Sequence, residues 1–256
     1  MNRLPISSGN GNLRHDSGHL GSFTSQLPGH SEILPRYSLF APLHYEPNYS
    51  YPLIVWLHGP KDNEHQLRRI MPLLSLRNYA AIGPRATNAY ADQTPGFFWA
   101  TQAGSVSAAE RSVLDCLEVA RSRFNVNPER VFLAGYDCGG TMAFEVGLRH
   151  PDKFAGVISL GGSFPTARPL LSSLPQLRKL PLFIAHGRDS AEYPVERLCE
   201  DLRLFHVAGM SVTVRQYPCG DELTTKMLQD LNLWIMERVT GQKHEPVEVP
   251  QLDDRN

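Results

Sequence analysis

The sequence predicts an α/β fold with a mostly parallel, doubly wound sheet that carries helices on both faces. Short runs of aliphatic and β-branched residues alternate with longer amphipathic stretches along most of the 256-residue chain. Several short runs are apolar throughout, which is typical of strands buried on both faces. Parallel neighbours need a crossover element, so the alternation favours helices between the strands. We therefore expect one domain over residues 31–240.

The predicted elements follow one another in this alternating order. Residues 105–124 form the clearest helix, because apolar residues recur at helical spacing and Ser107 precedes Glu110 as in a capping box. The segment 64–70, EHQLRRI, is expected to be a solvated helical face. The expected strands are 36–43, 51–59, 79–85, 128–140 with its sharp turn, 154–162, 180–189 and 210–218, and the other helices are 140–150, 193–209 and 223–239.

Composition and charge exclude several classes of function. The chain has 25 basic and 26 acidic residues, well mixed and with a net charge of −1, so we expect no nucleic-acid partner. No apolar run has the length of a signal peptide or a membrane span. The four cysteines form no CxxC pair, which favours reduced thiols and a cytoplasmic location. The polar segments 1–30 and 241–256 are expected to be flexible tails.

The stretch FLAGYDCGGTMAF, residues 132–144, has the layout of a nucleophile elbow. In that motif, G-x-S-x-G, a serine stands on a sharp turn between a strand and a helix. Here Asp137 stands in the place of the serine. A carboxylate there is either a different nucleophile or an anion favoured at a helix N-terminus.

Three further segments complete a family resemblance. They are WLHGPKDNEHQL at 56–67, HGRDSAEYPVERLCEDL at 186–202 and YPCGDELTTKMLQDLNLWI at 217–235. With the elbow, they make the chain resemble an α/β-hydrolase of the phospholipase/carboxylesterase family, which includes the acyl-protein thioesterases. The resemblance implies an α/β-hydrolase fold without a large cap domain, since only a short loop fits between residues 162 and 180.

The resemblance also implies three positions for a catalytic triad. Asp137 matches the nucleophile, Ser190 the acid and Asp221 the histidine base, while Asp189 could serve as the acid after a shift of one residue. An aspartate is a poor base for serine activation near neutral pH, because its ordinary pKa lies roughly three units too low. The sequence therefore predicts that all three triad-equivalent positions are substituted.

The oxyanion hole differs from the family pattern as well. The resemblance assigns one donor to the N–H of Cys138 and the other to the residue at Pro60, which has no N–H. The Cys138 thiol is either packing or a thiolate activated at the helix N-terminus. Residues expected to line a pocket, or in the case of the aromatic ones to anchor the loop over it, are His58, Gly59, Phe97, Phe98 and Trp99.

Two functions remain open at this point. The first is an inactive hydrolase homologue that acts by binding an unknown small molecule or a protein. The alternative is a working ester or thioester hydrolase, or an aspartate-nucleophile hydrolase, built on Asp137. We expect no cofactor and no metal. Asp137 and Asp221, with Asp189, Glu192 or Glu222, could bind Ca²⁺ or Mg²⁺ unless Arg188 or water neutralises them. The oligomeric state is open, with a homodimer among the alternatives.

Overall fold

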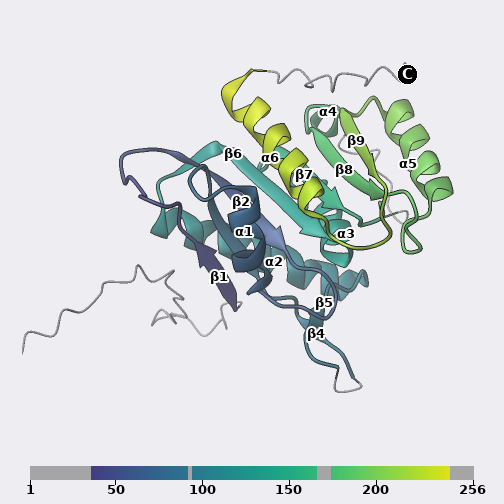
Figure 1. Ribbon diagram of the computed structural model, residues 1–256, viewed down its shortest axis with the longest axis horizontal. Coiled ribbons are helices and arrows are strands. Elements are labelled where there is room, and N and C mark those ends of the chain that lie inside the picture. Colours follow the sequence, from purple (N-terminus) through teal and green to yellow (C-terminus); the bar gives the residue numbers. More distant parts are fainter. Residues whose placement is uncertain (1–35, 92–93, 166–173, 243–256) are drawn as a thin grey trace, which may run out of the picture.

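The computed structural model of the protein describes residues 36–91, 94–165 and 174–242. A seven-stranded sheet in the order β1-β3-β2-β6-β7-β8-β9 forms its centre (Figure 1). Strand β1 is antiparallel to β3, and every other neighbouring pair is parallel. The strands are β1 Tyr37–Phe40, β2 Tyr51–Leu57, β3 Ala80–Pro84, β6 Val126–Tyr136, β7 Gly156–Leu160, β8 Leu182–Gly187 and β9 Val212–Tyr217. The predicted mostly parallel sheet is confirmed.

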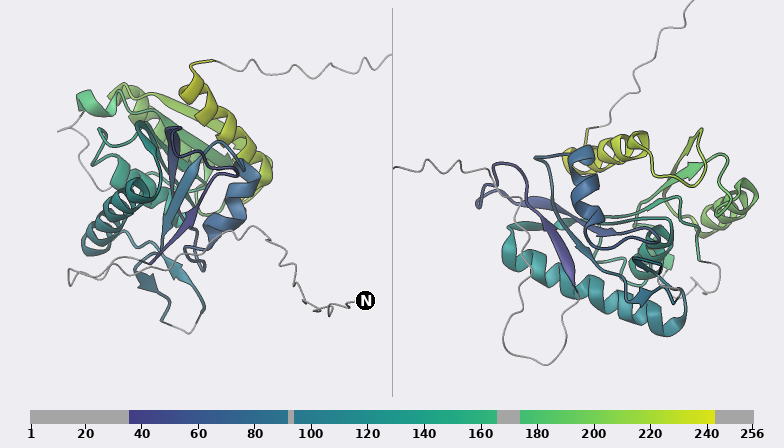
Figure 2. Two further views of the ribbon diagram at one scale, coloured as in Figure 1. Left: turned by 90° about the vertical axis from the view of Figure 1, so that its left-hand side faces the viewer. Right: turned by 60° about the horizontal axis from the view of Figure 1, so that its bottom comes forward.

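Helices cover both faces of this sheet, as predicted. Figure 2 shows α1 and α6 on one side and α2 on the other. The bounds are α1 Gln66–Leu74, α2 Ala103–Arg123, α3 Cys138–Gly147, α4 Leu174–Leu177, α5 Val195–Ala208 and α6 Thr225–Thr240. A small separate hairpin, β4 Asn88–Ala89 and β5 Phe97–Phe98, projects from the loop after β3. Within the described ranges no second domain interrupts the sheet.

The side chains of the central strands explain why the two layers of helices form. In β2, Leu53 and Val55 belong to the buried cluster that includes residues of α2, α3 and α5, whereas Ile54 and Trp56 belong to the cluster that includes residues of α1 and α6. All of β2 is buried, as its continuous apolar run predicts. Burial of a large aliphatic side chain contributes about 1.5–3 kcal/mol, so two-sided burial of such strands stabilises the sheet.

Two local predictions were wrong. Ser107 does not cap α2: the helix begins at Ala103, and the Ser107 hydroxyl donates to the Ala103 carbonyl at 3.0 Å. Val106 is fully buried, and its packing extends the helix toward the N-terminus. The segment 64–70 is not a solvated face, because Leu67 and Ile70 are buried against the core formed with α6.

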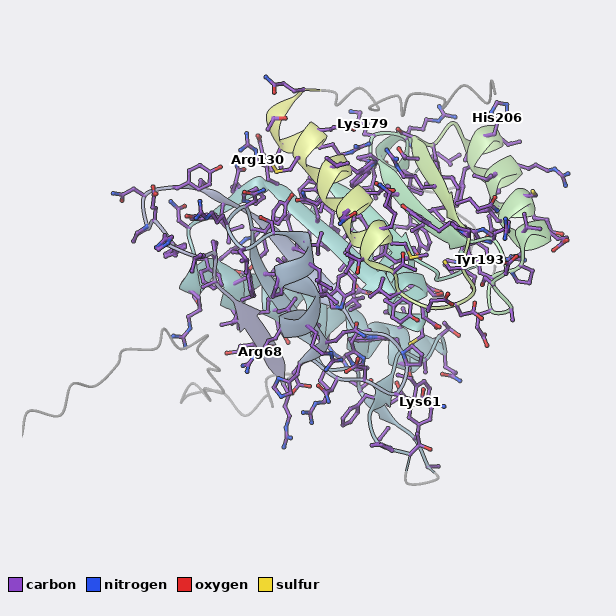
Figure 3. All side chains as sticks on the ribbon, in the orientation of Figure 1. Lys61, Arg68, Arg130, Lys179, Tyr193 and His206 are labelled. Atoms are coloured by element: carbon purple, nitrogen blue, oxygen red, sulfur yellow. The ribbon has the colours of Figure 1, made fainter. Side chains whose placement is uncertain are left out.

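The parallel strands place their carboxyl ends at one end of the sheet. Loops that follow β2, β6, β8 and β9 therefore meet there, which is where sites form in sheets of this type. Figure 3 labels Lys61, in the loop after β2, and Tyr193, in the loop after β8, at this end. The predicted tail 1–30 and nearly all of the tail 241–256 lie outside the described residues.

Candidate active site

The turn between β6 and α3 has the backbone of a nucleophile elbow. Asp137 has φ 52° and ψ −121°, a conformation that non-glycine residues rarely adopt. Close packing makes glycine necessary on both sides of the turn. A Cβ on Gly135 would lie 2.2 Å from the Gly139 carbonyl oxygen, and one on Gly139 would lie 2.3 Å from the Leu57 carbonyl oxygen. The glycines of the motif thus hold the strand and the helix in contact.

The Asp137 carboxylate accepts a hydrogen bond from the backbone N–H of Cys138, the next residue. Burial raises the pKa of the Asp137 carboxyl above its ordinary value, and the charges of Glu192 and Asp221 raise it further. The Cys138 N–H opposes this rise, because it stabilises the charged form. Asp137 is therefore a partly buried acid whose charged form is disfavoured by its surroundings.

Ser190 and Asp221, which the sequence predicts to match the acid and the base, are in direct contact. The Ser190 hydroxyl donates to the Asp221 carboxylate, which also accepts the backbone N–H groups of Ala191 at 3.2 Å and Glu192 at 3.3 Å. The bond from Ser190 is the main reason that the pKa of the Asp221 carboxyl is lowered. Ser190 in turn accepts the N–H of Tyr193 at 2.9 Å. Asp221 thus joins the loop after β9 to the loop after β8.

Asp189 lies outside this contact. Its side chain is exposed and pairs with Arg188, with 3.2 Å between Nε and the carboxylate oxygen. Ser190, and not Asp189, therefore contacts the predicted base position. Because the Arg188 guanidinium pairs with Asp189, it does not act as the neutralising partner that the sequence suggested for Asp137 and Asp221.

The two buried histidines near these loops are engaged in structural hydrogen bonds. His58 Nε2 accepts the Ala86 N–H at 3.0 Å, so Nδ1 carries the proton and donates to the Gly59 carbonyl at 2.8 Å. Burial lowers the pKa of His58. His186 Nε2 donates to the Tyr193 carbonyl at 2.8 Å. Among the described histidines, none forms a hydrogen bond or ion pair with Asp137.

Of the two predicted oxyanion donors, one already has an acceptor and the other is missing. The Cys138 N–H donates to the carboxylate of Asp137, and Pro60 has no N–H. The N–H of Gly59 donates to Gln66 Oε1 at 3.2 Å. A developing oxyanion would therefore have to compete with existing acceptors for these groups.

The Cys138 thiol is not activated. Burial raises its pKa to about 11, and the charge of Asp137 contributes to the rise. A thiol with this pKa is protonated near neutral pH, so the thiolate alternative is wrong.

The three aromatic residues of the loop before α2 differ in their surroundings. Trp99 is 3% exposed, and its indole N–H donates to the His58 carbonyl at 3.0 Å. Phe97 is half-buried and bonds through its N–H to the Asp62 carbonyl, while Phe98 packs on Tyr90. These contacts favour the anchoring role over the pocket-lining role for Trp99.

Sequence patterns did not indicate two residues that hold the loops together. The Tyr136 hydroxyl donates to the Asp221 carbonyl at 2.6 Å, and a Cβ on Gly59 would lie 2.4 Å from the Tyr136 ring. Gln66 Oε1 accepts both the Trp56 indole N–H and the Gly59 N–H. Burial of Gln66 on α1 is the signal that could have suggested its role. This signal was missed because the segment 64–70 was wrongly expected to be a solvated face.

No group of three or more His, Cys, Asp or Glu side chains that could hold a metal ion occurs within the ranges the structure describes. The carboxylates of Asp137 and Asp221 use other donors, as described above. The suggested Ca²⁺ or Mg²⁺ site therefore has no geometric support in this part of the chain.

Fold and elbow together define an α/β-hydrolase. Residues 49–237 match the phospholipase/carboxylesterase family, and the chain belongs to this family. In sequence it is 29% identical over 117 residues to the carboxylesterase SOBER1 of Arabidopsis thaliana, covering 45% of this chain and 51% of SOBER1. That alignment therefore spans about half of the relative's length.

Solved structures of the family have the same fold. The crystal structure of SOBER1 superposes with a TM-score of 0.63 at 22% identity, covering 74% of this chain and 100% of that one. A Bacillus cereus carboxylesterase superposes with a TM-score of 0.66 at 17% identity, covering 81% of this chain and 96% of that one. Acyl-protein thioesterase 2 of Zea mays superposes with a TM-score of 0.62 at 17% identity, covering 80% of this chain and 99% of that one.

None of the helices in the described ranges combines the length and the apolar character that crossing a bilayer would require.

Proposed function

We propose that this protein is a catalytically inactive member of the phospholipase/carboxylesterase family that acts by binding a small molecule or a protein. In this proposal Asp137, Ser190 and Asp221 occupy the triad-equivalent positions, and none performs the role that a serine hydrolase needs there. The observation that carries the proposal is the hydrogen bond from Ser190 to Asp221. In a catalytic triad the acid accepts a hydrogen bond from the base. Here the Ser190 hydroxyl, at the acid position, donates to Asp221, at the base position.

The surrounding contacts support the same conclusion. Hydrolysis through a serine or an aspartate nucleophile needs a base that can take a proton near neutral pH. The lowered pKa of Asp221 makes it a weaker base than an ordinary carboxylate. His58 and His186 donate their ring protons to carbonyl groups, and the free nitrogen of His58 already accepts the N–H of Ala86. A covalent intermediate on Asp137 would thus lack a histidine to activate water.

A second candidate is a working hydrolase built on Asp137. Two observations favour it: the elbow keeps its unusual backbone, with φ 52° at Asp137, and burial raises the pKa of that carboxyl. Backbone strain and shifted pKa values both concentrate at functional sites. In this candidate Asp137 would act as the nucleophile or as the base that activates water.

Restoration of the triad tests whether only the chemistry was lost. The triple variant Asp137→Ser, Ser190→Asp, Asp221→His places an acid and a base at positions already within hydrogen-bond distance. If the old acyl site persists, this variant hydrolyses p-nitrophenyl acetate faster than the parent. The matched control carries Asp137→Ala with the same two other changes, and it should remain inactive. A further Pro60→Gly change restores the missing N–H and should raise the rate.

A further inference from the structure

A cavity lies where β2 begins and α6 ends, at the end of the sheet opposite the elbow. Its volume is about 240 Å³. Strands β2 and β6 are parallel, so the start of β2 lies far from Asp137 at the end of β6. Three separate segments form the cavity: the loop before β2, the loop between α1 and β3, and the last turns of α6. Its lining includes Glu46, Tyr49, Tyr51, Arg77, Met236 and Val239.

One wall of the cavity is aromatic and already held in place. The rings of Tyr49 and Tyr51 meet edge to face, with centroids 4.6 Å apart and planes at 74°. Tyr45 stacks on Tyr51 at 5.2 Å, and the Tyr51 hydroxyl accepts the N–H of Glu46 at 3.1 Å. Tyr49 itself is 47% exposed. A ligand ring that packs on Tyr49 would therefore order few side chains, which lowers the entropic cost of binding.

The part of the lining that α6 contributes is apolar. It consists of Met236 and Val239, and the Met236 sulfur accepts a hydrogen bond from Asn78 Nδ2 at 3.6 Å. A thioether packs favourably against an aromatic ring. Together with the aromatic wall, this part of the lining suits a flat apolar group.

Two opposite charges also line the cavity. Within the part of the chain that the structure describes, neither Arg77 nor Glu46 forms an ion pair. The backbone around Arg77 is fixed, because Ser75 Oγ accepts the N–H groups of Arg77 and Asn78 at 3.2 and 3.1 Å. A guanidinium suits a carboxylate, which it can bind through two parallel hydrogen bonds, and a carboxylate suits an ammonium group.

We propose that this cavity binds a small aromatic zwitterion, a single ring that carries both a carboxylate and an ammonium group. The ring lies between Tyr49 and Met236, the carboxylate on Arg77 and the ammonium on Glu46. The volume of about 240 Å³ is below the roughly 300–1,000 Å³ typical of sites for drug-sized ligands, which limits the ligand to about one ring. The proposal goes beyond the proposed function and does not depend on it, because the cavity shares no residue with the elbow.

Calorimetric titration of the full chain with L-phenylalanine tests this inference. We expect saturable binding, and at least tenfold weaker binding of three probes that each lack one group. These probes are 3-phenylpropionate without the ammonium, phenethylamine without the carboxylate and L-leucine without the ring. Equal binding of phenylalanine and any one of the three would contradict the assignment of the missing group.

Two variants place the binding in the cavity. Arg77→Gln, at an exposed position, should weaken phenylalanine binding at least tenfold, and Val239→Trp should abolish it by filling the cavity. The matched control Arg203→Gln removes an exposed arginine from α5 and should bind like the parent. Absence of saturable binding in the parent, or unchanged binding in Arg77→Gln, would overturn the proposal.

Discussion

The Ser190 hydroxyl donates a hydrogen bond to the Asp221 carboxylate, and so joins the loop after β8 to the loop after β9. The same carboxylate accepts two backbone N–H groups of the β8 loop. The contact is a structural clamp between two loops that, in a serine hydrolase of this family, would carry the acid and the base. Substitutions at this clamp should therefore change the stability of the protein. In an active enzyme, substitutions at the same positions would change the activity.

Removal of the clamp should destabilise the protein. Asp221→Ala leaves the donors Ser190, Ala191 and Glu192 without their charged acceptor, which we expect to cost about 1–2 kcal/mol in the free energy of unfolding. Asp189→Ala is the control, because Asp189 is exposed and should change this energy by less than about 0.5 kcal/mol. Urea unfolding measures both. Equal midpoints for the two variants would show that Asp221 is not a clamp.

Asp137→Asn should stabilise the protein at neutral pH. Asparagine tolerates positive φ and can accept the Cys138 N–H, but it carries no charge. Because the folded pKa of Asp137 is raised above its ordinary 3.8, the parent loses stability as pH rises through that folded pKa. The advantage of Asn over Asp should therefore be small below pH 3.8 and reach a plateau by neutral pH. Unfolding midpoints measured across this range test the sign, and an advantage that shrinks with rising pH would refute it.

The lowered pKa of His58 predicts that the protein loses stability in mild acid. Burial lowers its folded pKa below the ordinary 6.5, so the unfolded chain takes up the proton first. The contribution of neutral His58 is present above pH 6.5 and is lost as pH falls through 6.5 toward the folded pKa. His58→Gln should flatten this part of the stability profile. Identical profiles for the parent and His58→Gln would contradict the assignment.

The close approach of the elbow helix to β2 predicts a strong effect of a single methyl group. In Gly139→Ala the new Cβ would lie 2.3 Å from the Leu57 carbonyl oxygen, which we expect to cost about 1–3 kcal/mol or more. Gly104→Ala in α2 meets no atom within 4 Å, and the better helix propensity of alanine should stabilise by about 0.5–1 kcal/mol. Denaturant unfolding should thus give opposite signs for the two variants, and a harmless Gly139→Ala would refute the packing argument.

Local pattern was enough to predict the fold. Fully apolar runs such as residues 51–57 are typical of buried strands, and the glycines around Asp137 marked the sharp turn. The burial of Leu67 and Ile70 was missed, because it depends on contact with α6, far along the chain. The capping interpretation of Ser107 failed for the same kind of reason, since tertiary packing of Val106 moved the start of the helix.

The candidate site was harder to predict than the fold. Sequence motifs indicated Asp137, Ser190 and Asp221, which lie in the turn after β6 and in the loops after β8 and β9, but side-chain partners depend on distances that no motif contains. The hydrogen bond from the Cys138 N–H to Asp137 depends on the three-dimensional arrangement of the loops. The position of the His58 ring proton on Nδ1 depends on it as well. These contacts carry the argument against catalysis.

Hydrolysis of a thioester and of p-nitrophenyl acetate, compared between the parent and Asp137→Ala, tests the central claim most directly. If the elbow no longer performs the reaction, both proteins give the same rate, no higher than the background rate in buffer. A parent rate well above background that Asp137→Ala abolishes would contradict the account and establish a working hydrolase built on Asp137.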